Sequence, residues 1–301
     1  MMRIGRWISA LLLLAGIAAG TIADAPHEHA PLFVGSYRVL AVDFHVHSFP
    51  LSWATLSAWD TVLEARRQGL DAIAMTPHDH VWVAKVGQRF SRVIGGPTVL
   101  VGEEIVTPKY HLLAVGIRNT IHWNLPAADA IREVHAQGGV AIAAHPTKGF
   151  WPGYDAEAMQ MLDGAEVLHP LAYESAREYS ELRDFYGRTE GAAIGDSDYH
   201  GLGTMGLCRT LVFARDDSER AILEAVRARR TVVYDRDGRA YGNAELIWAA
   251  DKEPRIRELL AAPASQGGLL EAMSRVCGIL GLAGLVAFGF GREVIPNLRL
   301  R

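Results

Sequence analysis

The stretch YRVLAVDFHVHS, residues 37–48, joins an apolar run to two histidines that are two positions apart. The run predicts a buried β-strand that ends near His45 and His47. Side chains two positions apart on a strand lie on one face, so both imidazoles are placed to bind one metal ion. Asp43 has the same parity, and we expect it to orient one of these imidazoles or to cap the sheet.

The same arrangement, an apolar run beside a histidine or an acidic residue, recurs along the chain. The runs predict further buried strands, and imidazoles and carboxylates at their ends suit a shared cluster of divalent metal ions. The candidate ligands, in chain order, are His45, His47, His78, Glu104, His111, His145, Asp198 and His200.

Two of these candidates have acidic or basic neighbours that compete for the same role. Beside His78, we assign Asp79 and His80 to the loop that follows the strand. Glu103 is expected to point away from Glu104, because successive side chains on a strand alternate between its faces. Only Glu104 is therefore expected to enter the site.

Three other residues are expected to support the ligands. Asp196 has the parity of Asp198 and is expected to hydrogen-bond a ligand rather than bind metal itself. Glu166 lies inside the apolar run 165–168, where a supporting role is the favoured interpretation, and His169 at its end is a weaker pocket candidate.

Amphipathic helical stretches lie between several of the predicted strands. They cover residues 56–68, 127–137, 174–188 and 218–229. Strands that alternate with helices predict a parallel sheet, and chemistry at the carboxyl ends of many strands predicts a closed barrel. We therefore expect an α/β fold whose metal site lies at the C-terminal ends of the barrel strands.

Composition and charge argue against several classes of protein. The chain has 301 residues, of which 50% are hydrophobic, and its formal net charge is −4. No basic block or stripe is present, which argues against a nucleic-acid partner. The two cysteines, Cys208 and Cys277, lie in different surroundings, so a disulfide or a thiolate zinc site is not expected.

Both ends of the chain contain apolar runs. Residues 1–25 have basic residues, an apolar core and small residues, which is typical of a secretory signal peptide, with an uncleaved anchor as the alternative. Residues 276–291 are apolar and flanked by arginines, which favours a membrane span over a buried or interfacial helix. We therefore expect an exported, periplasmic or extracytoplasmic protein, held at the inner membrane through its C-terminal segment.

These features divide the chain into six predicted parts. They are a signal peptide (1–25), a linker (26–36), the barrel (37–250), a spacer (251–275), a transmembrane segment (276–291) and a basic tail (292–301).

The ordered set of candidate ligands resembles that of the PHP (polymerase and histidinol phosphatase) family of metal-dependent hydrolases. The matching residues run from His45 to His200, over half of the chain. Within this family the chain looks most similar to the carbaryl-hydrolase-like (CehA/McbA) branch. The resemblance implies a distorted, TIM-like (β/α)7 barrel and two or three divalent ions, with Mn, Fe, Zn and Mg as the candidate metals.

The resemblance also implies how the ligands divide between the ions. The first ion would be held by His45, His47, Glu104 and Asp198, the second by Glu104, His111 and His145, and the third by His78 and His200.

One position departs from the family pattern. Where the family has an aspartate about five residues after the HxH pair, this chain has Ser52, and Thr-Pro-His stands where Thr-Asp-His is usual. The third ion is therefore open, and either Asp79 compensates or the site is binuclear.

The metal cluster predicts a hydrolase that uses metal-activated water and needs no nucleophilic side chain. A phosphoester is the leading small-molecule substrate, and Lys148, Arg209 and Tyr173 are candidate substrate-binding residues in loops of the same face. The alternatives are hydrolysis of a carbamate, amide or carboxylic ester, or a metal-binding domain that has lost catalysis. Nothing in the sequence specifies an oligomeric state.

Overall fold

The computed structural model describes residues 2–23, 29–261 and 269–289. The chain forms two compact units, one comprising Met1–Pro26 with Pro263–Arg301 and the other comprising His27–Ala262. The second unit contains every candidate ligand. The predicted basic tail, 292–301, lies outside the described residues.

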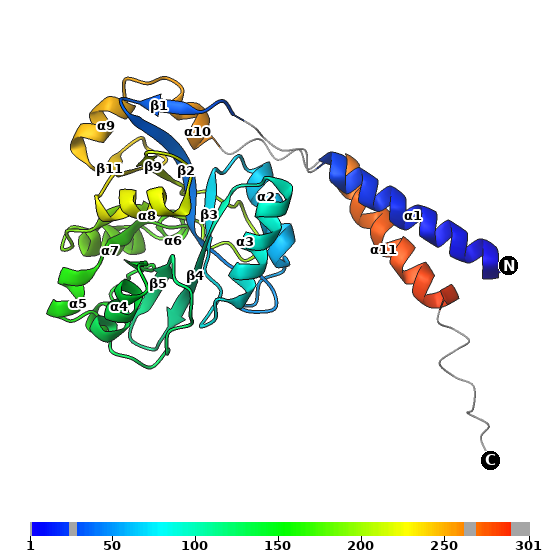
Figure 1. The fold of residues 1–301 in the computed structure, drawn as a ribbon, viewed down its shortest axis with the longest axis horizontal. Helices are drawn as coiled ribbons and strands as arrows, with labels where there is room; N and C mark the ends of the chain where they lie inside the picture. The colour runs from blue at the N-terminus through cyan, green and yellow to red at the C-terminus, as the bar shows by residue number, and fades with distance from the viewer. Residues whose placement is uncertain (1, 24–28, 262–268, 290–301) are drawn as a thin grey trace, which may run out of the picture. The chain divides into compact units, whose positions relative to one another are not determined.

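The second unit is built on one 11-stranded mixed sheet, which curls into a nearly closed barrel (Figure 1). The strand order is β11-β10-β9-β2-β3-β4-β5-β6-β7-β8, and β1 pairs with β2 outside this path. The strands are β1 (Leu32–Val34), β2 (Tyr37–Val46), β3 (Ala72–Met75), β4 (Thr98–Val106), β5 (His111–Val115), β6 (Val140–Ala143), β7 (Gly164–Leu168), β8 (Ala192–Gly195), β9 (Thr210–Ala214), β10 (Thr231–Tyr234) and β11 (Ala240–Gly242).

Helices cover this sheet. Ser57 caps the first turn of α2 by accepting from the Asp60 amide, and Ser218 caps α8 by accepting from the Ala221 amide. The helices are α2 (Ala58–Arg67), α3 (Trp82–Ile94), α4 (Ala127–Ala136), α5 (Ala156–Met161), α6 (Leu171–Glu174), α7 (Ala176–Tyr186), α8 (Glu219–Arg227), α9 (Ala244–Ala250) and α10 (Ile256–Leu260), with a 3-10 turn at Trp151–Gly153. The predicted α/β barrel is confirmed.

The prediction of a parallel sheet is wrong for its middle section and for its β9–β11 end, where β9 pairs antiparallel with β2 and β10, and β10 pairs antiparallel with β11. β5 pairs antiparallel with both β4 and β6, whereas β2–β3, β3–β4, β6–β7 and β7–β8 are parallel. The short connection from β4 to β5 contains no helix, so the chain turns back on itself. As a result His111, the first residue of β5, lies opposite Val106 at the end of β4.

Two apolar clusters lie on the two faces of the barrel sheet. One joins alternate strand residues such as Leu40, Val42 and Phe44 to the buried face of α8. The other packs strand residues against α2, α3 and α4, and it includes Val46. The register of β2 shifts between Asp43 and Val46. This irregularity breaks the alternation, so His45 and His47 take the face of Phe44 and not that of Asp43.

The barrel domain extends beyond its predicted limits. β1 lies within the expected linker and pairs with β2. α10 lies within the expected spacer, and its residues Ile256 and Leu259 are buried in a cluster with β2, β9 and β10. Apolar side chains in both segments are buried against the barrel, and the free energy gained by this burial explains why the segments belong to the domain and are not a linker and a spacer.

The first unit pairs two helices, α1 (Met2–Ala23) and α11 (Leu269–Gly289). They approach closely at Gly16 and Gly278, where a Cβ on Gly16 would lie 2.6 Å from the Gly278 nitrogen. Ser274 Oγ donates to the Gly16 carbonyl at 2.8 Å. The segment expected to be a signal peptide thus includes a helix with a partner, which does not support its assignment as a leader.

Within the part of the chain that the structure describes, no helix is long and apolar enough to cross a membrane. The transmembrane segment predicted for residues 276–291, whose last two residues lie outside the described part of the chain, is not supported.

The apolar cluster that contains Leu40, Val42 and Phe44 gives a prediction about stability. Phe44 is fully buried there, so Phe44→Ala should lower the free energy of unfolding by about 3–5 kcal/mol through lost burial and the cavity left behind. Phe33→Ala is the matched control, because the Phe33 side chain is 57% exposed. Urea unfolding followed by circular dichroism measures both. Equal losses would show that Phe44 does not contribute to the core.

Candidate metal centre

The eight predicted ligands meet at one edge of the barrel. His45 and Glu104 lie near the carboxyl ends of β2 and β4, and His111 begins β5. The other five lie in loops just after β2, β3, β6 and β8; they are His47, His78, His145, Asp198 and His200. Because β5 runs antiparallel, its first residue faces the carboxyl ends of its neighbours, and His111 joins the cluster for that reason.

Glu104 lies at the centre of the cluster, with its side chain 2% exposed. Its Oε1 lies 2.8 Å from His111 Nδ1 and 3.1 Å from His145 Nε2. Its Oε2 lies 3.3, 3.5 and 3.2 Å from the Nε2 atoms of three further histidines, which are His45, His47 and His78 respectively. The two oxygens therefore face two different sets of imidazoles, as in a carboxylate that bridges two ions.

Asp198 is a second carboxylate that approaches the Nε2 atoms of His45 and His47. Its Oδ1 lies 2.9 Å from His47 Nε2 and 3.3 Å from His45 Nε2. The His200 ring stacks on that of His47, with 4.0 Å between their centroids. The side chains that the sequence separates by more than 150 positions therefore share one site.

Donor atoms in this cluster gather into groups whose members lie within 4.8 Å of one another. Three groups consist of predicted ligands: His45, His47 and Asp198; His45, Glu104 and His145; and His47, His78 and His200. The first lies within the expected first site, whereas the other two join His45 or His47 to residues expected at the second or third site, and His111 belongs to none of them. A fourth group was not expected as a ligand set and comprises His45, Glu166, His169 and Asp196.

Several buried donor atoms in the cluster have no hydrogen-bond partner among the described residues. They are His45 Nε2, both ring nitrogens of His47, His169 Nε2 and Asp198 Oδ1. A buried polar atom without a partner costs free energy, so such atoms are rare and call for a compensating ligand. Imidazole nitrogens and carboxylate oxygens are the ligands of Mn, Fe and Zn, so the residues present fit divalent cations.

Electrostatics in the metal-free cluster couple one imidazole to three acids. Burial alone would lower the pKa of His45, but the charges of Asp198, Glu104 and Glu166 raise it well above its usual value. Burial likewise opposes ionisation of Glu104 and Asp198, yet His45 and the other imidazoles hold both pKa values well below the usual range. A cation that binds these carboxylates competes with the His45 proton, so metal binding is expected to release protons.

His47 behaves differently from His45. Burial lowers the pKa of His47 to about 4, and the neighbouring charge of His45 adds to the effect. Its ring is therefore neutral at physiological pH, which is the form that binds a metal ion.

Glu166 and His169 are more central than the sequence indicated. Glu166 Oε1 lies 2.9 Å from His45 Nδ1, and its Oε2 accepts from the His145 amide at 2.7 Å. This carboxylate fixes the His45 tautomer and turns Nε2 toward the cluster. His169 Nε2 lies 3.4 Å from Asp198 Oδ2. The sequence signal that could have indicated the role of Glu166 is its place as the acidic residue in the otherwise apolar run 165–168.

Asp43 supports the site through the backbone and not through an imidazole ring. It accepts from the amides of His45 at 3.3 Å, Ser197 at 3.1 Å and Gly206 at 2.7 Å. It thereby anchors the loop that carries Asp198. The strand irregularity described above explains why the expected contact with a ring is replaced by contacts to backbone.

Asp196 is fully buried beside Glu166. Burial, followed by the charge of Glu166, raises the pKa of Asp196 well above its usual value. It belongs to the candidate metal-binding group formed with His45, Glu166 and His169, and among the described residues neither of its carboxylate oxygens forms the predicted hydrogen bond to a ligand.

Asp79 does not replace the aspartate that the family pattern would place at Ser52. Asp79 Oδ1 accepts from the Val106 amide at 3.2 Å, and Asp79 belongs to none of the donor groups among the described residues. Ser52 Oγ accepts from the His78 amide at 2.6 Å. Ser52 therefore positions the backbone of a candidate ligand.

Four non-glycine residues at the site adopt positive φ angles. They are Ser52 (66°), Asp79 (53°), His145 (25°) and Asp198 (46°). This region is costly for residues with a side chain, and such strain concentrates at functional sites. The surrounding hydrogen bonds hold two candidate ligands, His145 and Asp198, in these conformations.

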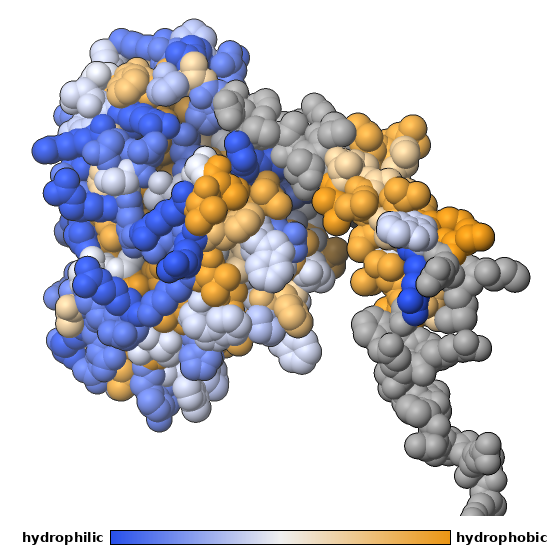
Figure 2. All heavy atoms as spheres, turned by 45° about the vertical axis from the view of Figure 1, so that its right-hand side comes forward, coloured by the Kyte–Doolittle hydropathy of each residue, from blue (hydrophilic) through white to orange (hydrophobic). Residues whose placement is uncertain are grey.

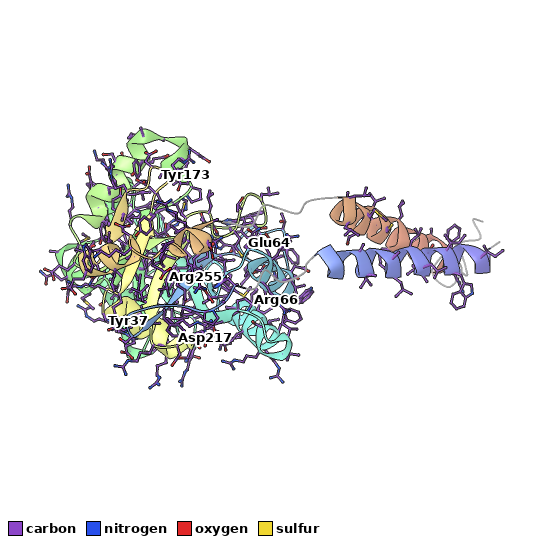
Figure 3. The ribbon with its side chains drawn as sticks, turned by 90° about the horizontal axis from the view of Figure 1, so that it is seen from above. Tyr37, Glu64, Arg66, Tyr173, Asp217 and Arg255 are labelled. Atoms are coloured by element: carbon purple, nitrogen blue, oxygen red, sulfur yellow. The ribbon has the colours of Figure 1, made fainter. Side chains whose placement is uncertain are left out.

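The predicted substrate-binding residues are not part of the cluster. Lys148 is exposed, with its Nζ 5.9 Å from the centre of the Trp151 ring. Tyr173, labelled in Figure 3, comes from α6 and has the Arg236 guanidinium 3.5 Å from its ring centre.

Arg209 is placed differently from the prediction. It is only 3% exposed and donates to the carbonyls of Gly206, Gln68 and Leu259. Burial lowers its pKa to about 10. Arg209 joins three segments of the domain, and the sequence could not show this because the partner carbonyls lie far away along the chain.

Comparison with known proteins supports the fold. A family model described as PHP-associated matches residues 180–231. A two-domain protein from Bacteroides vulgatus, described as containing a predicted PHP-like metal-dependent phosphoesterase, superimposes with a TM-score of 0.60 at 23% identity. That likeness covers 74% of this chain and 72% of the other. An amidohydrolase from Chromobacterium violaceum gives a TM-score of 0.43 at 14% identity, covering 75% of this chain and 99% of that one.

One curated relative, the uncharacterized protein MJ1587 of Methanocaldococcus jannaschii, is 26% identical over 106 residues. The match spans 35% of this chain and 61% of the relative. Together with the structural likeness, the family match defines a PHP-like α/β barrel and confirms the resemblance to PHP proteins. The carbaryl-hydrolase-like branch is not confirmed.

The central position of Glu104 can be tested against its neighbour. Glu104→Gln keeps the size of the side chain but removes the charge that faces five imidazoles, so the metal content per chain should fall by at least half. Elemental analysis of protein purified with Mn, Fe and Zn supplied measures this.

Glu103→Gln is the control for that variant. Glu103 Oε1 accepts from the Ile121 amide at 2.6 Å on the opposite face, and a glutamine oxygen can still accept there. Equal metal content in the two variants would show that Glu104 does not hold the ions.

Proposed function

We propose that this protein is a metal-dependent hydrolase that cleaves phosphoesters. The observation that carries the proposal is the convergence of eight predicted ligands around Glu104, with buried donor atoms that have no other partner. Two or three divalent ions are proposed, because the two oxygens of Glu104 face different imidazoles and His47, His78 and His200 form a further group.

When bound, the ions would lower the pKa of water, polarise the ester oxygen and neutralise charge that develops on the leaving group. The chain's own residues would hold the ions and orient the side chains that bind them. Glu166 keeps His45 in the tautomer whose Nε2 faces the cluster, and Asp43 and Ser52 fix the backbone of the loops beside the ligands. No serine or cysteine nucleophile is assigned.

The choice of a phosphoester rests on two supports. The ligand set resembles that of a family named for a phosphatase, and the Bacteroides vulgatus protein with this fold is described as containing a predicted phosphoesterase. Closely spaced metal ions also suit the displacement of an alcohol from phosphorus, because they neutralise both the attacking and the leaving oxygen.

A carbamate, amide or carboxylic ester is the second candidate. The loops next to His78 and His200, residues 48–57 and 199–207, contain no lysine or arginine. A dianionic phosphate would then rely on the metal ions alone at this side of the site. This deficit of cationic side chains favours the second candidate over a catalytically inactive domain.

One panel of substrates separates these candidates. Full-length protein loaded in turn with Mn, Fe and Zn is assayed with an aryl phosphate, an aryl carbamate and an aryl carboxylic ester. We expect phosphate release from the aryl phosphate. The rate should fall at least about a hundredfold when His45 and His47 are both replaced by alanine, because those imidazoles contact Glu104 and Asp198. Turnover of the carbonyl substrates only would overturn the phosphoesterase proposal, and none at all would favour an inactive domain.

Export is a separate proposal, which rests on the basic and apolar start of the chain. If the barrel lies outside the cytoplasm, protease added to spheroplasts should digest it while a cytoplasmic protein in the same cells stays intact. Protection of both proteins until the cells are lysed would place the barrel inside.

A further inference from the structure

Large apolar side chains are exposed on three segments that directly follow ligand-bearing strands, two of them loops and the third the start of α3. They are Phe49 (59% exposed), Trp53 (95%), Trp82 (50%) and Leu202 (81%), and we call them the apolar rim. Figure 2 shows apolar side chains at the surface of the domain between hydrophilic regions. Single exposed apolar residues are ordinary, but several beside one candidate site call for a reason.

Hydrogen bonds tie the rim loops directly to two candidate ligands. Ser52, next to Trp53, accepts from the His78 amide at 2.6 Å. Thr55 donates its amide to the His200 carbonyl at 2.9 Å. The rim is therefore held beside the His78 and His200 side of the metal centre.

The rim loops also touch each other. A Cβ added to Gly201 would lie 3.2 Å from the Thr55 nitrogen, so the loop of Leu202 packs against the loop of Trp53. Their apolar side chains belong to one continuous edge of the site and not to separate surfaces.

Charged side chains are absent from two of the three segments that carry the rim. Residues 48–57 and 199–207 contain no aspartate, glutamate, lysine or arginine. A substrate that approaches across these loops meets aromatic and aliphatic groups and polar backbone, so its recognition there depends on burial of apolar surface.

The conformation of Trp53 indicates that its exposure is not incidental. Its φ of 54° is unfavourable for a bulky residue, and its side chain gains almost nothing from packing within the domain. Strain without compensating burial is expected where a residue serves a ligand.

We propose that the apolar rim binds the alcohol part of the substrate, so that the protein acts on phosphate esters of apolar alcohols. This proposal rests on the phosphoesterase function proposed above. The metal centre would hold the phosphoryl group, and the rim would cover the alkyl or aryl group of the leaving alcohol. The P–O bond to that alcohol breaks, water supplies the new oxygen on phosphorus, and a proton from water ends on the alcohol.

The test compares hexyl phosphate with ethyl phosphate. Both leave as primary alkoxides of similar basicity, so a difference in kcat/KM reports contact with the longer chain and not intrinsic reactivity. For the metal-loaded full-length protein we expect kcat/KM to be about tenfold higher for hexyl phosphate, from partial burial of four additional methylenes.

Variants assign that preference to the rim. Trp53→Ala and Leu202→Ala should each reduce the hexyl-to-ethyl ratio of kcat/KM about threefold or more, because the ethyl group is too short to gain as much from contact with the rim. Trp248→Ala is the matched control, since Trp248 is 65% exposed but lies on α9. Inhibition by hexylphosphonate and ethylphosphonate, which are not hydrolysed, should show the same ratio and the same response to the variants.

The outcomes separate the two proposals. Hydrolysis of both esters at equal kcat/KM, or a ratio that the rim variants do not change, would overturn the role of the rim and leave the phosphoesterase function standing. No phosphate release from either ester, in protein with bound metal, would overturn the proposed function and the substrate class with it.

Discussion

The site depends on one buried carboxylate, Glu104, whose two oxygens face different histidines. Oε1 contacts His111 and His145, and Oε2 contacts three imidazoles from the opposite side. A buried acid in this position is costly without cationic partners, and its low pKa shows how strongly the imidazoles stabilise its charge. The strands that deliver these groups must therefore end at one edge, and the fold is arranged to meet that requirement.

Two irregularities of the sheet satisfy it. The antiparallel β5 brings the start of a strand to an edge that otherwise collects strand ends, which is how His111 reaches Glu104. The shift in β2 turns His45 and His47 to the interior face while Asp43 holds the loop of Asp198. Both features interrupt a regular barrel, and both lie next to the candidate site, as is usual for features that aim side chains.

The two sides of the metal centre differ in character. On the inner side, Glu166, Asp196 and His169 surround His45 with buried polar groups that orient it. On the outer side, the segments 48–57 and 199–207 contain no aspartate, glutamate, lysine or arginine and carry exposed aromatic and aliphatic groups. The inner side is suited to fixing the ions and the outer side to contacting the organic part of a substrate. This division accounts for a site rich in ligands but poor in lysine and arginine.

The sequence alone predicts the α/β class and eight candidate ligands, because apolar runs that end in histidine or acid are local patterns, and the structure brings these eight side chains together. It indicated Glu103 and Glu104 correctly through alternation alone. The direction of β5, the structural role of Arg209, the importance of Glu166 and the structured residues beyond the predicted barrel limits were decided by tertiary structure. Each of these features depends on contacts between residues that lie far apart in the chain, whereas the periodicity of a sequence reflects only local requirements.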